Sequence, residues 1–345
     1  MSTYNTVIKK RNAQNNGWDS ILPITTAENV LVDESGKTVK DYTNIISGKN
    51  YLINGNFDIW QNGTTFDNPQ DVYTADMFKI ASEADTKVRA LRSLDVPNSL
   101  SKYSFRMQQL DTIGASGTYT DIMHYIEDYK IFKGQKVTFS FYAKFNSGSS
   151  GLAYIYDGHT LEIVYILTPV DDQWHKYQVT KLMSINSTMA SITLRCFRNG
   201  ISPGNGANFA QCKLEFGDIA TPFVPNTFAE ELSACQRYYE KTFSYEIKPA
   251  NGDNNYGGAL SAIAIASSFQ PLINWRYKVV KRITPTVTLY CPSSTSPIGQ
   301  WSNGLNNTTD ARSAYGNDAG TTIDNTDILV PSGAYFIHAV ADARL

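Results

Sequence analysis

The residues from Trp301 to Asp318 combine side-chain types that suit the recognition of a sugar. An indole or phenol ring can stack on the C–H groups of a sugar ring, while amides and carboxylates bind its hydroxyls. This Gly- and Asn-rich segment contains Trp301, Asn303, Tyr315 and Asp318. Because ordinary loops have a similar composition, the pattern predicts either a glycan-binding surface or a loop without a ligand.

Residue types that catalyse reactions are present but follow no catalytic motif. The four histidines are spread over the chain, at His124, His159, His175 and His338. They match no metal-binding spacing such as H-E-x-x-H, and no G-x-S-x-G sequence occurs. A glycosidase needs two carboxylates that face one substrate, whereas adjacent acidic residues such as Asp171 and Asp172 point to opposite faces of a strand. We therefore expect no enzyme and no catalytic residue.

The composition of the 345 residues indicates a folded chain without a polyanionic partner. Hydrophobic residues make up 42% and charged residues 18%, so disorder throughout is excluded. The net charge of −2 argues against binding to nucleic acid, and no apolar stretch is long enough for membrane insertion. The N-terminus also lacks the apolar core of a signal peptide, so we expect the protein to be made and stay soluble in a cytoplasm.

The four cysteines are expected to be small buried residues. Cys196, Cys212, Cys235 and Cys291 lie far apart without a C-x-x-C motif, which makes a zinc site or a disulfide framework a poor prediction. Cys196 and Cys212 could still face each other on adjacent strands.

The hydrophobic pattern is typical of an all-β protein. Seven Asn-Gly dipeptides mark tight turns, and residues between them alternate between apolar and polar. The clearest case is Lys136 to Phe145, which predicts a half-buried strand. Trp60 and Trp174 lie beside such alternating patterns, so we expect both to anchor a core.

One segment has helical spacing. Phe228, Leu232, Cys235 and Tyr239 recur every three or four residues, and Thr227 with Glu230 forms a T-x-x-E capping box. The pattern predicts a helix over 227–240 that links two β domains.

Residues 1–48 are polar and contain too few apolar side chains for a core of their own. Their apolar residues gather at Trp18, Ile21, Leu22, Ile24, Val30, Leu31 and Val32. The segment is either a flexible tail or a surface that docks on a neighbouring chain, and the apolar cluster favours docking.

Three stretches resemble a recurrent module of bacteriophage tail-fibre and baseplate proteins. Residues 50–80 contain the opening N-G-N-F sequence, and a Y-x-A-D-R-W pattern in which Met77 and Phe78 replace Arg and Trp. Residues 138–144 match a T-F-S-x-x-A-K strand, and residues 211–239 contain A-T-P-F after a closing strand. The end of the chain, from 284, is similar to the small C-terminal β domain of the same proteins.

The resemblance implies an all-β fold with four parts. These are a short N-terminal attachment and oligomerisation segment at 1–48, a carbohydrate-binding-module-like jelly-roll sandwich at 49–226, the linking helix at 227–240, and a smaller C-terminal β domain at 241–345 as a receptor-binding tip. It also implies a homotrimer, attachment to other tail or baseplate proteins through residues 1–48, and a virion location after assembly in the host cytoplasm. The expected receptor is a host surface polysaccharide.

The sequence leaves three functions open. The first is a phage adhesin that binds host cell-surface glycan, the second a baseplate or tail-fibre scaffold without its own receptor, and the third a carbohydrate-binding accessory module of a bacterial enzyme. No cofactor is expected except a structural calcium ion, which the resemblance implies near Asn54, Asn56 and Glu215. Calcium would require several oxygens to converge on it.

Overall fold

The protein is described by a computed structural model that covers residues 8–11, 18–21, 48–82, 87–111, 119–146, 148–166, 171–197, 201–265, 271–293, 299–303, 308–325 and 333–345. The chain divides into two compact units, Met1–Gly48 and Lys49–Leu345. In the first unit, β1 (Ile8–Arg11) and β2 (Trp18–Ile21) form an antiparallel hairpin. The apolar residues expected at 22–32 lie outside the described residues, so docking through this segment stays a prediction.

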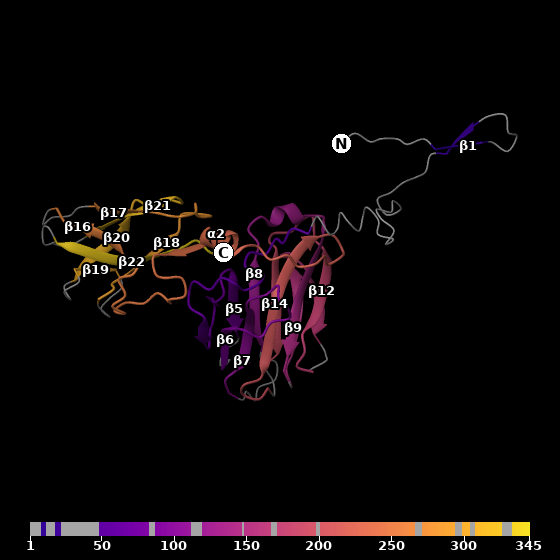
Figure 1. The fold of residues 1–345 in the computed structure, drawn as a ribbon, viewed down its shortest axis with the longest axis horizontal. Helices are drawn as coiled ribbons and strands as arrows, with labels where there is room; N and C mark the ends of the chain where they lie inside the picture. Colours follow the sequence, from indigo (N-terminus) through magenta and orange to yellow (C-terminus); the bar gives the residue numbers. More distant parts are fainter. Residues whose placement is uncertain are drawn as a thin grey trace. The chain divides into compact units, whose positions relative to one another are not determined.

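Residues 49–226 contain two six-stranded antiparallel sheets (Figure 1). The first sheet has the order β11 (Leu161–Ile166), β10 (Ser150–Tyr156), β13 (Ser191–Phe197), β8 (Tyr119–Tyr125), β5 (Phe78–Ser82) and β4 (Val72–Tyr73). The second sheet has the order β12 (His175–Leu182), β9 (Lys136–Phe145), β14 (Gly206–Phe216), β7 (Ser104–Gln109), β6 (Val88–Ser93) and β3 (Thr65–Asp67). A short 3₁₀ turn, η1, spans Tyr129–Phe132. The all-β jelly-roll prediction is confirmed.

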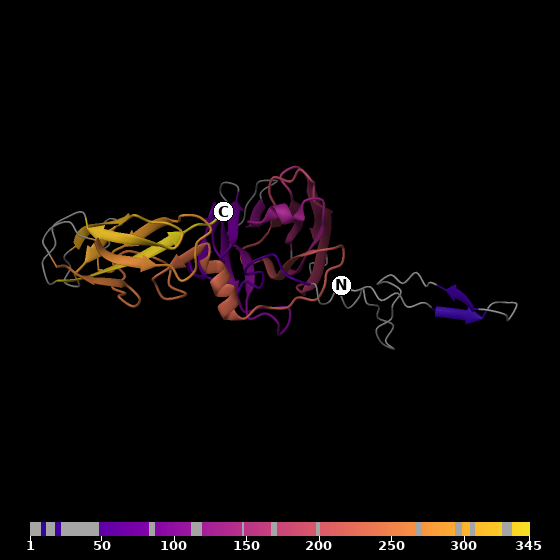
Figure 2. The same ribbon diagram turned by 90° about the horizontal axis from the view of Figure 1, so that it is seen from above.

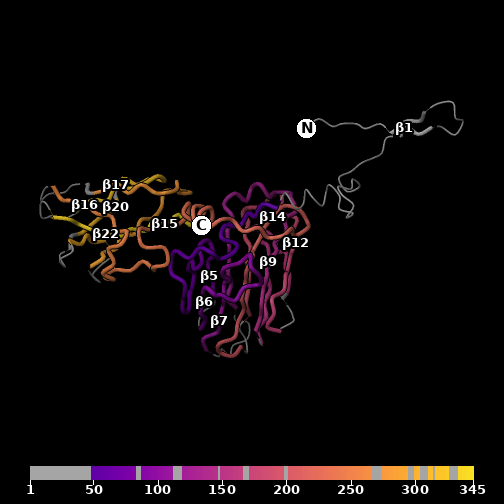
Figure 3. The backbone as a smooth tube through the Cα atoms, in the orientation of Figure 1, coloured from indigo at the N-terminus to yellow at the C-terminus, as the bar shows by residue number. Residues whose placement is uncertain are grey.

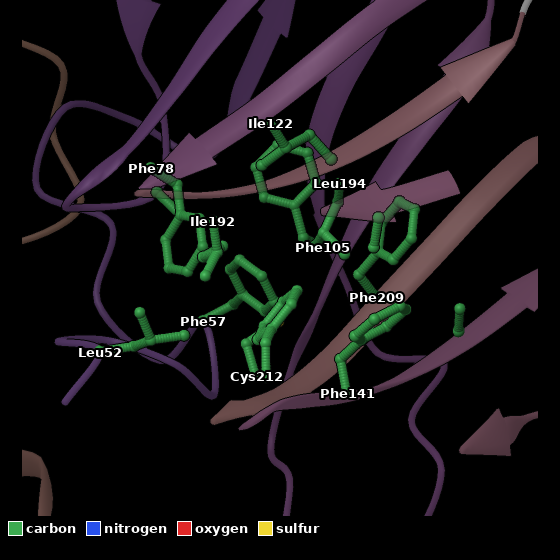
Figure 4. Close-up of a cluster of buried hydrophobic side chains, with 14 of the residues drawn as sticks. Leu52, Phe57, Phe78, Phe105, Ile122, Phe141, Ile192, Leu194, Phe209 and Cys212 are labelled. Atoms are coloured by element: carbon green, nitrogen blue, oxygen red, sulfur yellow. The ribbon is translucent and has the colours of Figure 1, made fainter. Parts of the chain in front are cut away.

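The jelly-roll core lies between the two sheets. Figure 4 shows inward side chains from both of them, including Phe105, Phe141 and Phe209 from the second sheet and Ile122, Ile192 and Leu194 from the first. Trp60 is fully buried in this core and stacks on Phe105, as expected of an anchor. Burial of these large side chains supplies the main driving force for the sandwich.

Strand β9 has the bounds that the alternating pattern predicts, but its outer face is less exposed than expected. Thr138 and Ser140 point away from the core and are nevertheless buried. Thr138 donates a hydrogen bond to the carbonyl of Gly217 at 2.8 Å, and residues 221–223 pass beside Ser140. The half-buried prediction is therefore wrong for the first half of the strand, because the chain after β14 folds back over it.

Helix α2 spans Phe228–Gln236 and begins with the predicted capping box. The Thr227 hydroxyl accepts from the Glu230 amide, and the Glu230 carboxylate accepts from the Thr227 amide. The helix ends earlier than predicted, because Tyr239–Lys241 forms strand β15 and pairs with β22. Cys235 packs the helix against Ile59 and Met77 of the jelly roll.

The C-terminal residues form a third sheet around a long central strand (Figure 2). Its order is β15 (Tyr239–Lys241), β22 (Ala334–Asp342), β19 (Gln300–Ser302), β20 (Thr308–Ala314), β21 (Gly320–Asn325) and β17 (Pro271–Arg276). Strands β16 (Leu260–Ile263) and β18 (Thr286–Tyr290) also pair with β22. A separate core fills this domain, with Trp275, Trp301, Ile323 and Ile337 among its members.

All four cysteines are buried, as expected of small core residues. Cys196 lies in β13 and Cys212 in β14, so they belong to different sheets rather than adjacent strands. Among the described residues, no helix is long and apolar enough to cross a membrane.

Candidate functional site

The expectation that Trp301 is an exposed loop residue is wrong. Trp301 lies in β19, has no exposed surface, and donates its indole N–H to the carbonyl of Asp324 at 3.1 Å. Strand β19 pairs with β20 and β22, and the Trp301 ring packs in the core of this domain, whose members include Trp275 and Ile323. A ring enclosed in this way cannot stack on a sugar, so Trp301 is a core residue.

The other predicted residues do not assemble around Trp301. Tyr315 is 86% exposed and borders a groove of about 150 Å³, together with Asn317 and Asn274. Asp318 is exposed, and its carbonyl accepts from the Lys281 amide at 2.8 Å. Asn303 directly follows β19, is half-buried and does not line that groove. Because the ring of Tyr315 is almost fully exposed, few protein groups hold it in place. This surface is therefore the weaker candidate for a glycan-binding site.

A better-formed groove lies on the outer face of the second sheet, over strands β12, β9 and β14, which run side by side (Figure 3). Its volume is about 240 Å³. We call it the sheet groove and define it by its lining residues, which are Asn98, Leu100, Ser140, Tyr142, Lys176, Gln211, Thr221, Pro222 and Phe223.

Two aromatic rings, both half-buried, stand in the sheet groove. Tyr142 projects from the outer face of β9, opposite Lys176 on β12 and opposite Ala210 on β14. Phe223 follows the chain reversal after β14 and lines the same groove. The sheet groove thus combines the apolar rings of Tyr142 and Phe223 with the ammonium group of Lys176.

A β-bulge places an amide at the bottom of the sheet groove. The register of β14 on β9 shifts between Ala210 and Lys213, and Gln211 adopts a φ of 53°. Bulges of this kind redirect a side chain. The Gln211 amide donates to Asn98 at 2.8 Å and to Ser101 at 2.9 Å. These two hydrogen bonds fix the side chain of Gln211, which is 3% exposed.

A buried ion pair holds the wall that carries Phe223. Lys213 and Glu215 lie side by side on the outer face of β14, with Nζ and Oε2 3.2 Å apart. The Glu215 carboxylate accepts from the Thr221 amide at 2.9 Å, and Lys213 donates to the carbonyl of Pro222 at 3.0 Å. These bonds fix the chain reversal against the sheet.

Residues expected near calcium are instead engaged with protein groups. Glu215 binds Thr221, the Asn54 amide donates to the carbonyls of Ile59 and Asp76, and Asn56 binds Asp58 and Leu100. No group of three His, Cys, Asp or Glu side chains suited to a metal occurs in the described part of the chain. The three residues thus support the fold around them, and calcium stays an untested expectation.

A polar network extends the same face beyond the sheet groove. Trp174 donates its indole N–H to Asp95 at 3.0 Å, and Lys144 approaches the other oxygen of Asp95 at 2.9 Å. The hydrogen bond from Lys144 to Asp95 raises the pKa of Lys144. Trp174 is half-buried and does not belong to the jelly-roll core, so the prediction of a core anchor is wrong.

The outer face of the first sheet also presents tyrosines. Tyr154 and Tyr156 alternate with the core residue Ile155 along β10, and Tyr165 on the neighbouring edge strand is 55% exposed. Arg195 stacks on Tyr119 at 3.5 Å from the ring centroid and pairs with Asp121. This face carries rings and an internally satisfied ion pair, and none of these residues borders a described pocket.

The side chains that line the sheet groove are of types that suit a polar ring molecule. The lining supplies amide, hydroxyl and ammonium groups together with two rings, a mixture that suits a sugar. Among its described lining residues none is Asp or Glu. Tyr142 and Lys176 could have been found from the outward positions of their alternating strands. Gln211 and Phe223 depend on a bulge and a chain reversal that leave no clear local pattern.

No protein-family model and no curated protein sequence matches the chain. Among solved structures it resembles the enzymatically active domain of tailspike protein 4 from bacteriophage CBA120, with a TM-score of 0.35, 17% identity, and coverage of 49% of this chain and 21% of that chain. TmCBM61 in complex with beta-1,4-galactotriose matches with a TM-score of 0.33, 12% identity, and coverage of 49% and 99%. The xylan-binding domain CBM22-1 of Xyn10C from Paenibacillus barcinonensis matches with a TM-score of 0.31, 12% identity, and coverage of 50% and 98%. The chain thus spans about a fifth of the tailspike domain's length.

Proposed function

We propose that this protein binds carbohydrate, and that the sheet groove on the jelly roll holds a neutral glycan. The observation that carries the proposal is that Tyr142, Phe223 and the fixed amide of Gln211 line one groove. Rings of this kind take the apolar face of a sugar, and immobilised polar groups bind its hydroxyls without a large loss of side-chain entropy. The ammonium group of Lys176 adds a hydrogen-bond donor at the edge.

We further propose that the glycan lies on a bacterial cell surface and that the chain is an adhesin of a phage tail. The support is the resemblance of residues 50–80 and 211–239 to tail-fibre and baseplate modules. Attachment through residues 1–48 and a homotrimeric state belong to the same proposal. A threefold assembly would multiply weak single-site binding through avidity.

Binding without cleavage is part of the proposal. Hydrolysis of a glycosidic bond uses two carboxylates on either side of the bond, and the described lining of the sheet groove supplies none. Incubation with the glycan that the protein binds should therefore release no oligosaccharide. Release that disappears after replacement of one carboxylate would overturn this part.

The test measures binding of the full chain to a panel of neutral oligosaccharides and purified bacterial surface polysaccharides. On the tightest ligand, Tyr142→Ala should weaken binding about five- to tenfold, because loss of a stacked ring costs on the order of 1 kcal/mol or more. Tyr142 is half-buried on the outer face, so the variant should melt normally.

Tyr315→Ala is the matched control, because it removes an exposed ring from the C-terminal domain. It should leave binding unchanged. If Tyr315→Ala weakens binding and Tyr142→Ala does not, the glycan site belongs to the C-terminal domain and the sheet groove is refuted. If the wild type, Tyr142→Ala and Tyr315→Ala bind the glycan with equal affinity, neither the sheet groove nor the surface at Tyr315 is the binding site.

A further inference from the structure

A second pocket, of about 250 Å³, lies where the jelly roll, helix α2 and the C-terminal domain meet. Its walls come from the turn at Asp58, from β6, from the residues just before β7, from the start of α2 and from the turn after β15. We call it the junction pocket. It shares no lining residue with the sheet groove.

Asp58 lines this pocket, and one oxygen of its carboxylate has no hydrogen-bond partner. Its Oδ1 atom is buried and has no hydrogen-bond partner, whereas Oδ2 accepts from the Asn56 amide at 3.0 Å. Burial raises the pKa of Asp58. A buried acceptor without a donor is unfavourable, and an O–H or N–H group from a bound molecule would relieve it. The site therefore favours a ligand that donates a hydrogen bond.

Aromatic rings form the wall beside this carboxylate. Phe228, the first residue of α2, is 53% exposed and meets Tyr245 edge to face, with ring centroids 5.3 Å apart. Tyr245 is fixed because its hydroxyl donates to the carbonyl of Asp58 at 2.9 Å and accepts from the Trp60 amide at 2.8 Å. An unpartnered acceptor next to an ordered apolar wall matches the two faces of a sugar ring.

The charges of the junction pocket balance. Arg92 pairs with Glu246 at 2.6 Å, and its guanidinium stacks over Tyr103, 4.2 Å from the ring centroid. Lys102 lies over the same ring at 4.9 Å and, being positive, offsets the charge of Asp58. A strongly charged ligand would meet a group of its own sign, so a neutral ligand fits better.

We propose that the junction pocket binds one neutral sugar residue, with a hydroxyl donating to the Asp58 carboxylate and the ring packed on Phe228. This site goes beyond the sheet groove and does not require it. The loop between β6 and β7 lines both, with Leu100 on the groove and Lys102 on the pocket.

The test uses galactose, glucose and N-acetylglucosamine as separate probes with the full chain, and measures saturation-transfer NMR signals over a concentration series. At least one probe should bind the wild type. Asp58→Ala removes the acceptor oxygens, and Phe228→Leu keeps an apolar side chain and removes only the ring. Each change should weaken that binding at least fivefold. Circular dichroism verifies that the variants are folded.

Tyr142→Ala separates the two sites. It should not change binding of the probe to the junction pocket. In a protein that already carries Phe228→Leu, Tyr142→Ala should still weaken the binding of longer glycans. If Tyr142→Ala alone abolishes the probe signal, the sugar sits in the sheet groove and the junction site is refuted, although the proposed function stands. Absence of a signal from all three probes, or unchanged binding in both junction variants, also overturns the inference.

Discussion

Replacement of Trp301 by alanine distinguishes a core tryptophan from a binding platform. Trp301 has no exposed surface and packs in the C-terminal core with Trp275, Ile323 and Ile337. Its indole N–H satisfies the carbonyl of Asp324. The change would leave a cavity of nearly the whole indole and remove the donor from that carbonyl.

The expected loss of unfolding free energy is about 3–5 kcal/mol, the usual cost of truncating a buried aromatic residue to alanine. The orphaned carbonyl of Asp324 contributes about 1 kcal/mol within that range. Because a domain's whole stability is about 5–15 kcal/mol, the C-terminal domain of the variant should be close to its unfolding threshold.

Urea unfolding followed by far-UV circular dichroism measures this change without relying on the tryptophan's own fluorescence. Tyr315→Ala is the comparison, because its ring is exposed and its loss should alter stability by no more than about 0.5 kcal/mol. A Trp301→Ala protein within about 1 kcal/mol of the wild type would refute the core assignment. Weaker glycan binding at unchanged stability would restore Trp301 as a ligand platform.

Three further changes test the fold around the sites. Burial lowers the pKa of His124 from its usual 6.5 to about 4, so as the pH falls the unfolded chain takes up a proton before the folded chain does. The stability should therefore fall by up to about 3 kcal/mol as the pH drops from 6.5 to 4. His124→Asn should flatten this pH dependence in urea titrations at several pH values. Thr227→Ala removes the capping box and should cost about 0.5–2 kcal/mol in the same assay, whereas Thr227→Ser should restore most of it. Gly55→Ala would place a methyl carbon 2.1 Å from the carbonyl oxygen of Cys212, so it should destabilise the jelly roll by about 1–3 kcal/mol, and an unchanged melting temperature would contradict this close approach.

Local patterns predicted the elements whose structure depends on near neighbours. The alternation of β9 gave its bounds, because side chains of a strand alternate between core and outer face. The capping box at Thr227 marked the start of α2, since both of its hydrogen bonds form within one turn. The end of that helix was missed, because β15 is defined by pairing with the distant strand β22.

The sequence by itself determined that this is an all-β protein with a short helix between two cores, because turn residues and side-chain alternation are properties of neighbouring positions. Only the tertiary structure decided which rings are exposed. Trp301 is flanked by polar residues in the sequence but is buried in the core of the C-terminal domain, whereas Tyr142 is half-buried on the outer face of β9. The candidate groove depends on the bulge at Gln211 and on the reversal that carries Phe223, and both arise from contacts between segments far apart in the chain.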